Sequence, residues 1–111
     1  ECGACTVIID GKAVNSCLYH IMETEGKSVT TIEGLASQDG ILHPLQKAFI
    51  DNGAVQCGFC TPGMIMSAKA LTDNKEKPTE EEIKDAVAGN LCRCTGYVKI
   101  IDAIKSFAGG R

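Results

Sequence analysis

The first third of the chain consists of short β-branched runs separated by turn residues. Residues 6–9 (Thr-Val-Ile-Ile) favour a strand, and the Asp10-Gly11 pair that follows is a strong signal for a two-residue hairpin. Residues 13–18 are the expected return strand, and residues 27–32 are a candidate third strand. Residues 33–40 are the expected boundary to a second, helical part.

Beyond this boundary, apolar residues recur at helical spacing. A first helix is expected from near His43 to just before Asn52, with an apolar face made of Leu42, Leu45 and Phe49. Thr61, followed by a proline, predicts the N-cap of a second helix that continues to Leu71. Residues 72–78 are polar and are expected to form a solvated loop.

Two further helices are predicted from residues that are typical of helix ends. Thr79 and Glu82 have the spacing of a capping box, and Gly89 is the expected end of this third helix. The fourth helix ends at Gly109-Gly110, and its apolar stripe consists of Tyr97, Ile100, Ile101, Ile104 and Ala108. The predicted fold class is therefore α+β.

Length and charge narrow the range of functions. The 111 residues suffice for one domain or two very small ones. A net charge of -3 argues against a nucleic-acid-binding protein, and no apolar run is long enough to span a membrane. The seven cysteines are an odd number, so they cannot all form intrachain disulfides. We expect metal ligands in a reducing compartment, the cytoplasm.

Four cysteines form one candidate metal site. The two residues between Cys57 and Cys60 allow both thiolates to face one centre, whereas the single residue between Cys92 and Cys94 requires a bent loop. Each pair precedes an expected helix, so the free N–H groups at its start, near Thr61 and Thr95, can point at an anionic centre. Tetrahedral sulfur sites suit zinc and iron–sulfur alike, so spacing leaves both open. A thioredoxin-like redox motif is weaker because no βαβ pattern surrounds it.

The other three cysteines are an incomplete ligand set. Cys2 and Cys5 match the second and third members of the plant-type ferredoxin run, and Cys17 follows. The first member would then lie upstream of Glu1.

Together these motifs resemble the iron–sulfur subunit or domain of the molybdenum hydroxylase (xanthine oxidase) family. That family includes xanthine dehydrogenase, aldehyde oxidoreductases and aerobic carbon monoxide dehydrogenase. The matching stretches lie in the family's order over nearly the whole chain, at residues 1–7, 14–18, 56–64 and 90–97. A match this specific favours iron–sulfur over zinc.

The resemblance implies two 2Fe–2S clusters in two domains. Residues 1–36 would be the C-terminal part of a ferredoxin-like β-grasp domain, whose cluster is held by Cys2, Cys5, Cys17 and a ligand upstream. Residues 37–111 would be a four-helix bundle, whose cluster is held by Cys57, Cys60, Cys92 and Cys94.

The resemblance also implies partners and a direction of electron flow. Electrons would pass from molybdopterin on a large subunit, through the bundle cluster and the β-grasp cluster, to an FAD-binding subunit. Cys94 and Gln56 are expected to lie against the pterin. Such a chain is the electron-transfer subunit of an oxidoreductase complex and carries no substrate-transforming site of its own.

Two other functions stay open at this stage, a structural zinc-binding interaction module and a free ferredoxin-like carrier. His20 and His43 lie outside the cysteine motifs, and we expect a surface residue and a helix-start residue rather than ligands. Met64 and Met66 are expected to pack in the core.

Overall fold

A computed structural model describes residues 2–110. Glu1, the first residue of the first matching stretch, and Arg111, the last residue of the second expected domain, lie outside the described residues. A small antiparallel sheet has the strand order β2-β1-β3, with β1 spanning Thr6–Ile9, β2 Lys12–Asn15 and β3 Val29–Thr30. Asp10 and Gly11 have φ values of 49° and 83°, the left-handed pair that a tight I′ hairpin turn requires. The predicted hairpin is confirmed.

The expected second and third strands are shorter than predicted. The segment Ser16–Leu18 is a 3₁₀ turn instead of the end of a strand, because Ser16 bonds back to the Cys5 carbonyl through its N–H (3.3 Å) and its hydroxyl (2.8 Å). Within residues 27–32, only Val29–Thr30 pairs with β1, and the chain then enters another 3₁₀ turn at Ile32–Gly34.

Four helices follow, α1 (Pro44–Asp51), α2 (Thr61–Asn74), α3 (Glu80–Val87) and α4 (Val98–Gly109). The predicted capping box at Thr79 and Glu82 is present, with bonds of 3.2 and 2.8 Å. His43 caps α1, because its ring nitrogen accepts from the Leu45 N–H at 3.1 Å. The helix-start role expected for this histidine is therefore confirmed.

Both ends of α2 differ from the prediction. Its N-cap is Cys60 and not Thr61, because the Cys60 carbonyl already accepts the Met64 N–H at 3.0 Å. At the other end the helix continues through Thr72 to Asn74. The Thr72 hydroxyl donates to the Ala68 carbonyl at 2.9 Å and is buried, so this part of the predicted loop is helical.

The other two helices differ at one end each. Helix α3 ends at Val87, two residues before Gly89, where the Ala88 N–H turns back to the Asp85 carbonyl at 3.3 Å. Helix α4 begins at Val98, after Tyr97 in a left-handed conformation. Thr95 does not cap it.

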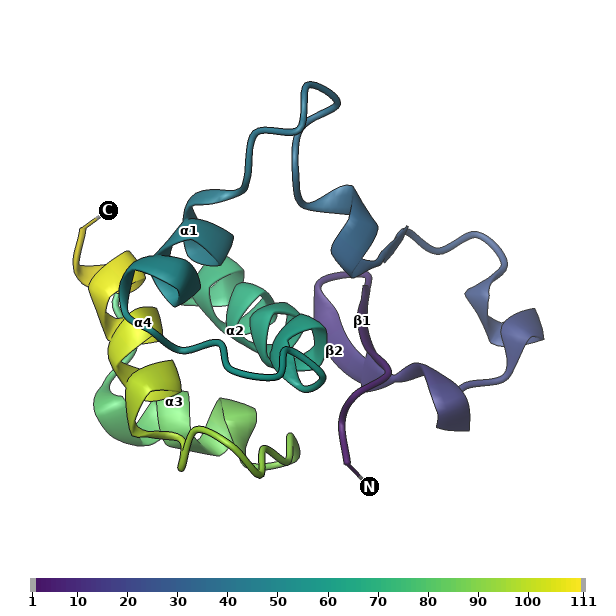
Figure 1. Cartoon of the computed structure of the whole chain (residues 1–111). Helices are drawn as coiled ribbons and strands as arrows, with labels where there is room; N and C mark the ends of the chain where they lie inside the picture. The colour runs from purple at the N-terminus through teal and green to yellow at the C-terminus, as the bar shows by residue number, and fades with distance from the viewer. Residues whose placement is uncertain (1, 111) are drawn as a thin grey trace.

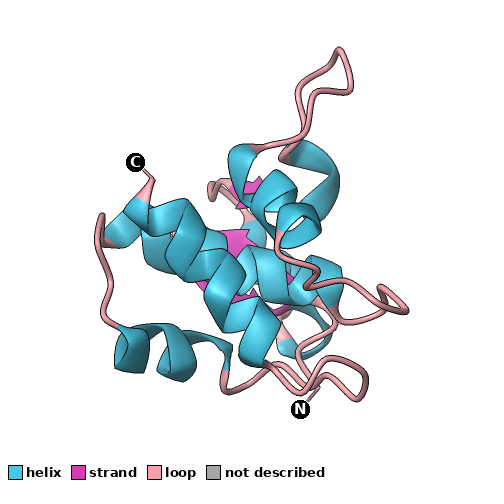
Figure 2. Ribbon diagram, turned by 60° about the vertical axis from the view of Figure 1, so that its left-hand side comes forward, coloured by secondary structure: helices cyan, strands magenta, loops and turns pink. Residues whose placement is uncertain are grey.

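Helix α2 lies at the centre, with the sheet on one side and the other helices on the other (Figures 1 and 2). Met66 and Ala70 of α2 pack against Ile8 of β1. The opposite side of α2 joins the main core, whose buried members are Leu45, Phe49, Ala54, Met64, Ile65, Ala68, Ile83, Val87, Ile100, Ala103 and Ile104. Met64 and Met66 are both fully buried, as expected.

These elements confirm an α+β fold with a small sheet and four helices. The domain boundary between residues 36 and 37 stays a prediction. Within residues 2–110, none of the helices combines the length and the hydropathy that a membrane span demands.

The packing around α4 yields a stability prediction. Ile104 is fully buried in the main core, whereas Val98 of the same helix is 66% exposed. We expect Ile104→Ala to lower the free energy of unfolding by about 2–5 kcal/mol. The matched control Val98→Ala should change it by less than about 0.5 kcal/mol. Urea denaturation followed by circular dichroism measures both, and equal losses would contradict this account of the core.

Candidate metal centre

Four cysteines lie on two loops that approach each other. Cys57 and Cys60 lie on the loop that joins α1 to α2, and Cys92 and Cys94 on the loop that joins α3 to α4. Cys60 and Cys92 are half-buried, whereas Cys57 and Cys94 are exposed. The site therefore has an inner side against the core and an outer side at the surface.

The four thiols associate as two pairs across the two loops. The Cys60 and Cys92 thiols lie close enough to shift each other's pKa, and the Cys57 thiol lies close enough to shift that of Cys94. No three His, Cys, Asp or Glu side chains among residues 2–110 converge on one point, as a single metal ion would need. In a 2Fe–2S cluster each iron takes two thiolates, so two pairs of thiols match the ligand pattern of such a cluster.

The sulfur of Cys92 lies within hydrogen-bonding distance of Thr95. Its contacts with Thr95 are 3.1 Å to the hydroxyl and 3.5 Å to the backbone N–H. Burial raises the pKa of Cys92, but bonds from the Thr95 hydroxyl and N–H and from the Cys60 thiol outweigh it and lower the pKa to about 7. The loop thus stabilises negative charge on this sulfur.

The pKa values of the neighbouring thiols Cys60 and Cys94 are raised. Burial, followed by the bond to Cys92 and the negative charges of Cys92 and Cys57, raises the pKa of Cys60 to about 11. The hydrogen bond to Cys57 raises the pKa of Cys94. A cationic iron centre would relieve this repulsion, because it holds each sulfur as a thiolate.

The bent loop around Cys92 is held by Tyr97. The Tyr97 hydroxyl accepts the Cys92 N–H at 2.9 Å, and the Tyr97 N–H donates to the Thr95 hydroxyl oxygen at 3.2 Å. The expected N–H donation to the site by Thr95 thus occurs, but from within this loop and not from a helix N-terminus. Tyr97, which the sequence placed on the apolar stripe and at the end of the last matching stretch, therefore also shapes the site.

The three N-terminal cysteines also lie near one another. The Cys17 N–H points at the Cys5 sulfur at 3.4 Å, and this bond is the main cause that lowers the pKa of Cys5. A hydrogen bond of the Cys17 thiol to the Cys5 sulfur raises the pKa of Cys17, and burial and the charges of Cys5 and Cys2 add to the rise. Cys2 and Cys17 are exposed. This second group thus has three thiols and an N–H donor that stabilises negative charge on one of the sulfurs.

The candidate Gln56 and two other residues next to the bundle cysteines lie at the surface. Gln56 and Arg93 are exposed beside the cysteines, and Phe59, between two of them, is 79% exposed. His20 is exposed in the loop after Cys17, as expected of a surface residue.

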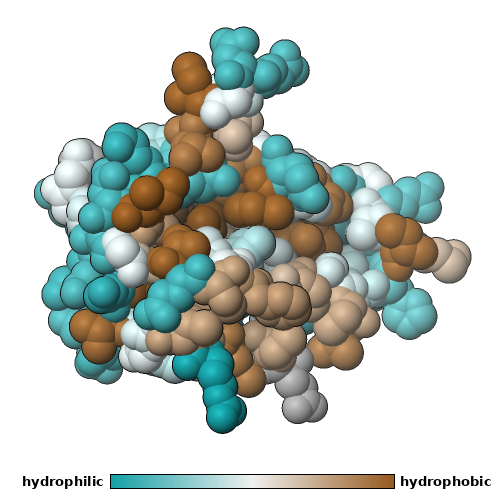
Figure 3. Space-filling model, in the orientation of Figure 1, coloured by the Kyte–Doolittle hydropathy of each residue, from teal (hydrophilic) through white to brown (hydrophobic). Residues whose placement is uncertain are grey.

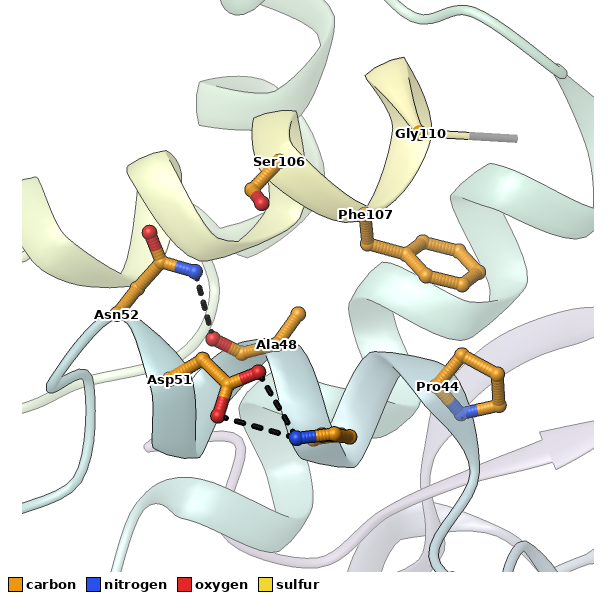
Figure 4. Close-up of a pocket in the computed structure, with 8 residues that line it drawn as sticks. Pro44, Ala48, Asp51, Asn52, Ser106, Phe107 and Gly110 are labelled. Atoms are coloured by element: carbon orange, nitrogen blue, oxygen red, sulfur yellow. Dashed lines mark hydrogen bonds and ion pairs between the residues drawn. The ribbon is translucent and has the colours of Figure 1, made fainter.

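Among the surface hollows formed by the described residues, two are lined by residues of α1. The larger, about 460 Å³, lies between α1 and α4; Phe107 and Pro44 form its apolar end, and the Lys47–Asp51 ion pair lies at its rim (Figure 4). The other, about 320 Å³, is apolar, is lined by Phe49, Ile50 and Val55, and reaches Gly58 next to Cys57. Neither of these two hollows is lined by a cysteine, whereas another, of about 310 Å³, is lined by Cys17 and His20.

The fold and this arrangement of thiols define a small cysteine-rich α+β domain with four cysteines paired across two loops between helices. Residues 31–105 match the family described as "[2Fe-2S] binding domain", and the chain belongs to that family.

Its relatives include iron–sulfur subunits of several dehydrogenases. The chain is 52% identical to the "Nicotinate dehydrogenase small FeS subunit" of Eubacterium barkeri, over 95% of this chain and 66% of the relative. It is 54% identical to the "Xanthine dehydrogenase iron-sulfur-binding subunit" of Escherichia coli O157:H7, over 94% and 66%. The chain thus spans about two thirds of the length of these curated relatives.

Solved structures agree with the fold. The aldehyde oxidoreductase of Desulfovibrio gigas superposes with a TM-score of 0.91 at 46% identity, over 98% of this chain and 12% of that one. Quinoline 2-oxidoreductase from Pseudomonas putida 86 gives a TM-score of 0.89 at 45% identity, over 98% and 68%. The resemblance to the iron–sulfur subunits of molybdenum hydroxylases is confirmed.

The contacts of Cys92 yield a prediction for the chain freed of metal. Thr95→Val removes the hydroxyl that lowers the pKa of Cys92, so this pKa rises from about 7 and the thiolate fraction at pH 7 falls. We expect alkylation of Cys92 by iodoacetamide at pH 7 to slow several-fold, as measured by mass spectrometry. The control Thr24→Val removes a hydroxyl bonded to the Ile21 carbonyl, away from the thiol pairs, and should leave the rate unchanged. An unchanged rate in Thr95→Val would contradict this assignment.

Proposed function

We propose that this chain is the electron-transfer iron–sulfur part of a molybdenum hydroxylase, an oxidoreductase of several subunits. It would pass electrons from a molybdopterin centre on a large subunit, through two 2Fe–2S clusters, toward an FAD-binding subunit. The observation that carries the proposal is the pairing of four thiols across two loops, in a chain of the [2Fe-2S] binding domain family.

The thiol pairs suggest how the bundle cluster is held. Cys60 and Cys92 would bind the inner iron, and Cys57 and Cys94 the outer one. Cys2, Cys5 and Cys17 would bind the second cluster, with a fourth ligand from upstream of residue 1. When bound, each cluster supplies a site that accepts and releases one electron at a time.

The chain's own contribution is to stabilise negative charge on the sulfurs. Thr95 donates to the Cys92 sulfur, and the Cys17 N–H donates to that of Cys5. Hydrogen bonds to cluster sulfurs favour the more negative, reduced state and so raise its reduction potential. These donors are fixed by the backbone, so they need no rearrangement when an electron arrives.

The outer side of the site is where a partner would approach. Cys94 and Gln56 are exposed there, and we propose that they lie against the pterin of the large subunit. Exposed apolar side chains lie on the same loops, namely Val55, Phe59 and Leu91, and the surface in Figure 3 shows apolar residues mixed with polar ones. Such a surface suits a permanent subunit contact better than a free carrier. The cytoplasm is the compartment that we propose for the complex.

This function predicts a specific loss in the assembled complex. Cys57→Ser removes a ligand of the bundle cluster, so we expect about two iron and two sulfide fewer per chain. Electron delivery to a flavin-side acceptor should fall to background, while molybdenum content is retained. The measurements are metal and sulfide analysis and turnover with an external acceptor.

Phe59→Ala is the matched control, because Phe59 lies on the same loop and has no role as a ligand. It should keep the full iron content. Normal turnover with the flavin-side acceptor in Cys57→Ser would overturn the proposed function.

A further inference from the structure

Asn90 is a buried polar residue that the account of the thiols does not use. It lies two residues before Cys92, is only 4% exposed, and belongs to none of the thiol pairs. A buried side-chain amide is costly unless its donors and acceptor are all bonded. Its partners therefore show what it holds in place.

The Asn90 amide joins three separate parts of the chain. Its nitrogen donates to the Gly3 carbonyl at 3.0 Å and to the Thr6 hydroxyl oxygen at 3.3 Å. Its oxygen accepts the Ser67 hydroxyl of α2 at 2.7 Å. The loop of the first cysteines, helix α2 and the loop of Cys92 thus meet at one side chain.

The three parts approach too closely to leave room for adjustment. A Cβ added to Gly63 of α2 would lie 2.3 Å from the Gly3 carbonyl oxygen. A Cβ added to Gly3 would lie 2.5 Å from the Asn90 amide nitrogen, and Gly3 has a φ of +78°. Only glycine fits at either position. The junction is therefore a direct contact between backbones, with a single register.

The same junction brings the two cysteine groups into contact through the main chain. Next to Asn90, the Leu91 N–H donates to the Cys2 carbonyl at 2.9 Å. Leu91 precedes Cys92, and Cys2 belongs to the other group. A shift of the Gly3 loop against Asn90 would thus change the separation of the two groups.

We propose that Asn90 is a positioning residue that fixes the spacing between the two iron–sulfur sites. This inference rests on the proposed function, since spacing matters only where electrons pass between the two sites. Tunnelling falls exponentially with distance, so a rigid junction keeps the exchange rate uniform from molecule to molecule. The carboxamide is required because Asp in its ionised form lacks the two N–H donors and Leu lacks both donors and acceptor.

The test is Asn90→Ala in the full-length chain within its complex. We expect both clusters to assemble, with iron and sulfide unchanged. Exchange of the Leu91 amide hydrogen should accelerate by about tenfold. Electron paramagnetic resonance measures the magnetic splitting between the two reduced clusters. This splitting should become smaller, or its lines should broaden because the spacing varies from molecule to molecule. Splitting and exchange both equal to those of the unsubstituted protein would overturn the proposal.

Two further variants keep the test decisive. Asn74→Ala is the control, because that amide also crosses the chain, to the Gly11 carbonyl at 3.0 Å, but far from the cysteine loops. It should leave the splitting unchanged.

Ser67→Ala removes one bond of the junction and is the variant to use if Asn90→Ala does not fold. The same changes in splitting and exchange are expected, to a smaller degree. Their absence would count against the proposal. Lack of iron in the unsubstituted complex would instead refute the proposed function, so the two failures are distinguishable.

Discussion

The burial of α2 on nearly its whole circumference is the constraint on which the rest of the structure depends. One side of the helix packs on β1 and the other on the three remaining helices. Cys60 is the N-cap of this helix, and Ser67 of the helix donates a hydrogen bond to Asn90, so α2 positions both loops that bear the bundle thiols. Gly63 allows the N-terminal loop to reach the same helix. A single buried helix thus sets the relative positions of both cysteine groups.

Electrostatics explains the form of the site. Four thiols held close together repel one another as thiolates, and the pKa of Cys60 near 11 records that repulsion together with burial. Fixed donors around Cys92 act in the opposite direction and lower its pKa to about 7. A site that gathers sulfur and also supplies N–H and O–H donors is suited to an anionic iron–sulfur group that becomes more negative on reduction.

Local signals in the sequence predicted most of the fold. The hairpin turn at Asp10-Gly11, the capping box at Thr79 and the four helices all depend on neighbouring residues, and all are confirmed. Helix ends near the cysteines were wrong, because Thr95 bonds to the Cys92 sulfur instead of capping α4. Thr72 was placed in a loop because it is polar, but tertiary burial and a bond within the helix keep it in α2.

The site was predicted in part only. The cysteine spacing indicated which thiols could meet, and two groups do meet, although their role as ligands stays a proposal. The pairing across loops and the junction at Asn90 could not be predicted, since they join residues up to 87 positions apart. The Asn90-Leu91 motif was noted for its resemblance alone, and the close approach of Gly3 and Gly63 has no local signal.

The central claim is that the paired thiols hold a 2Fe–2S cluster. Iron, zinc and acid-labile sulfide in the anaerobically purified chain, produced with ample iron, test it most directly. The account predicts equal amounts of iron and sulfide, about two of each for every cluster assembled, and a red-brown protein. Zinc without sulfide in a colourless protein would contradict it.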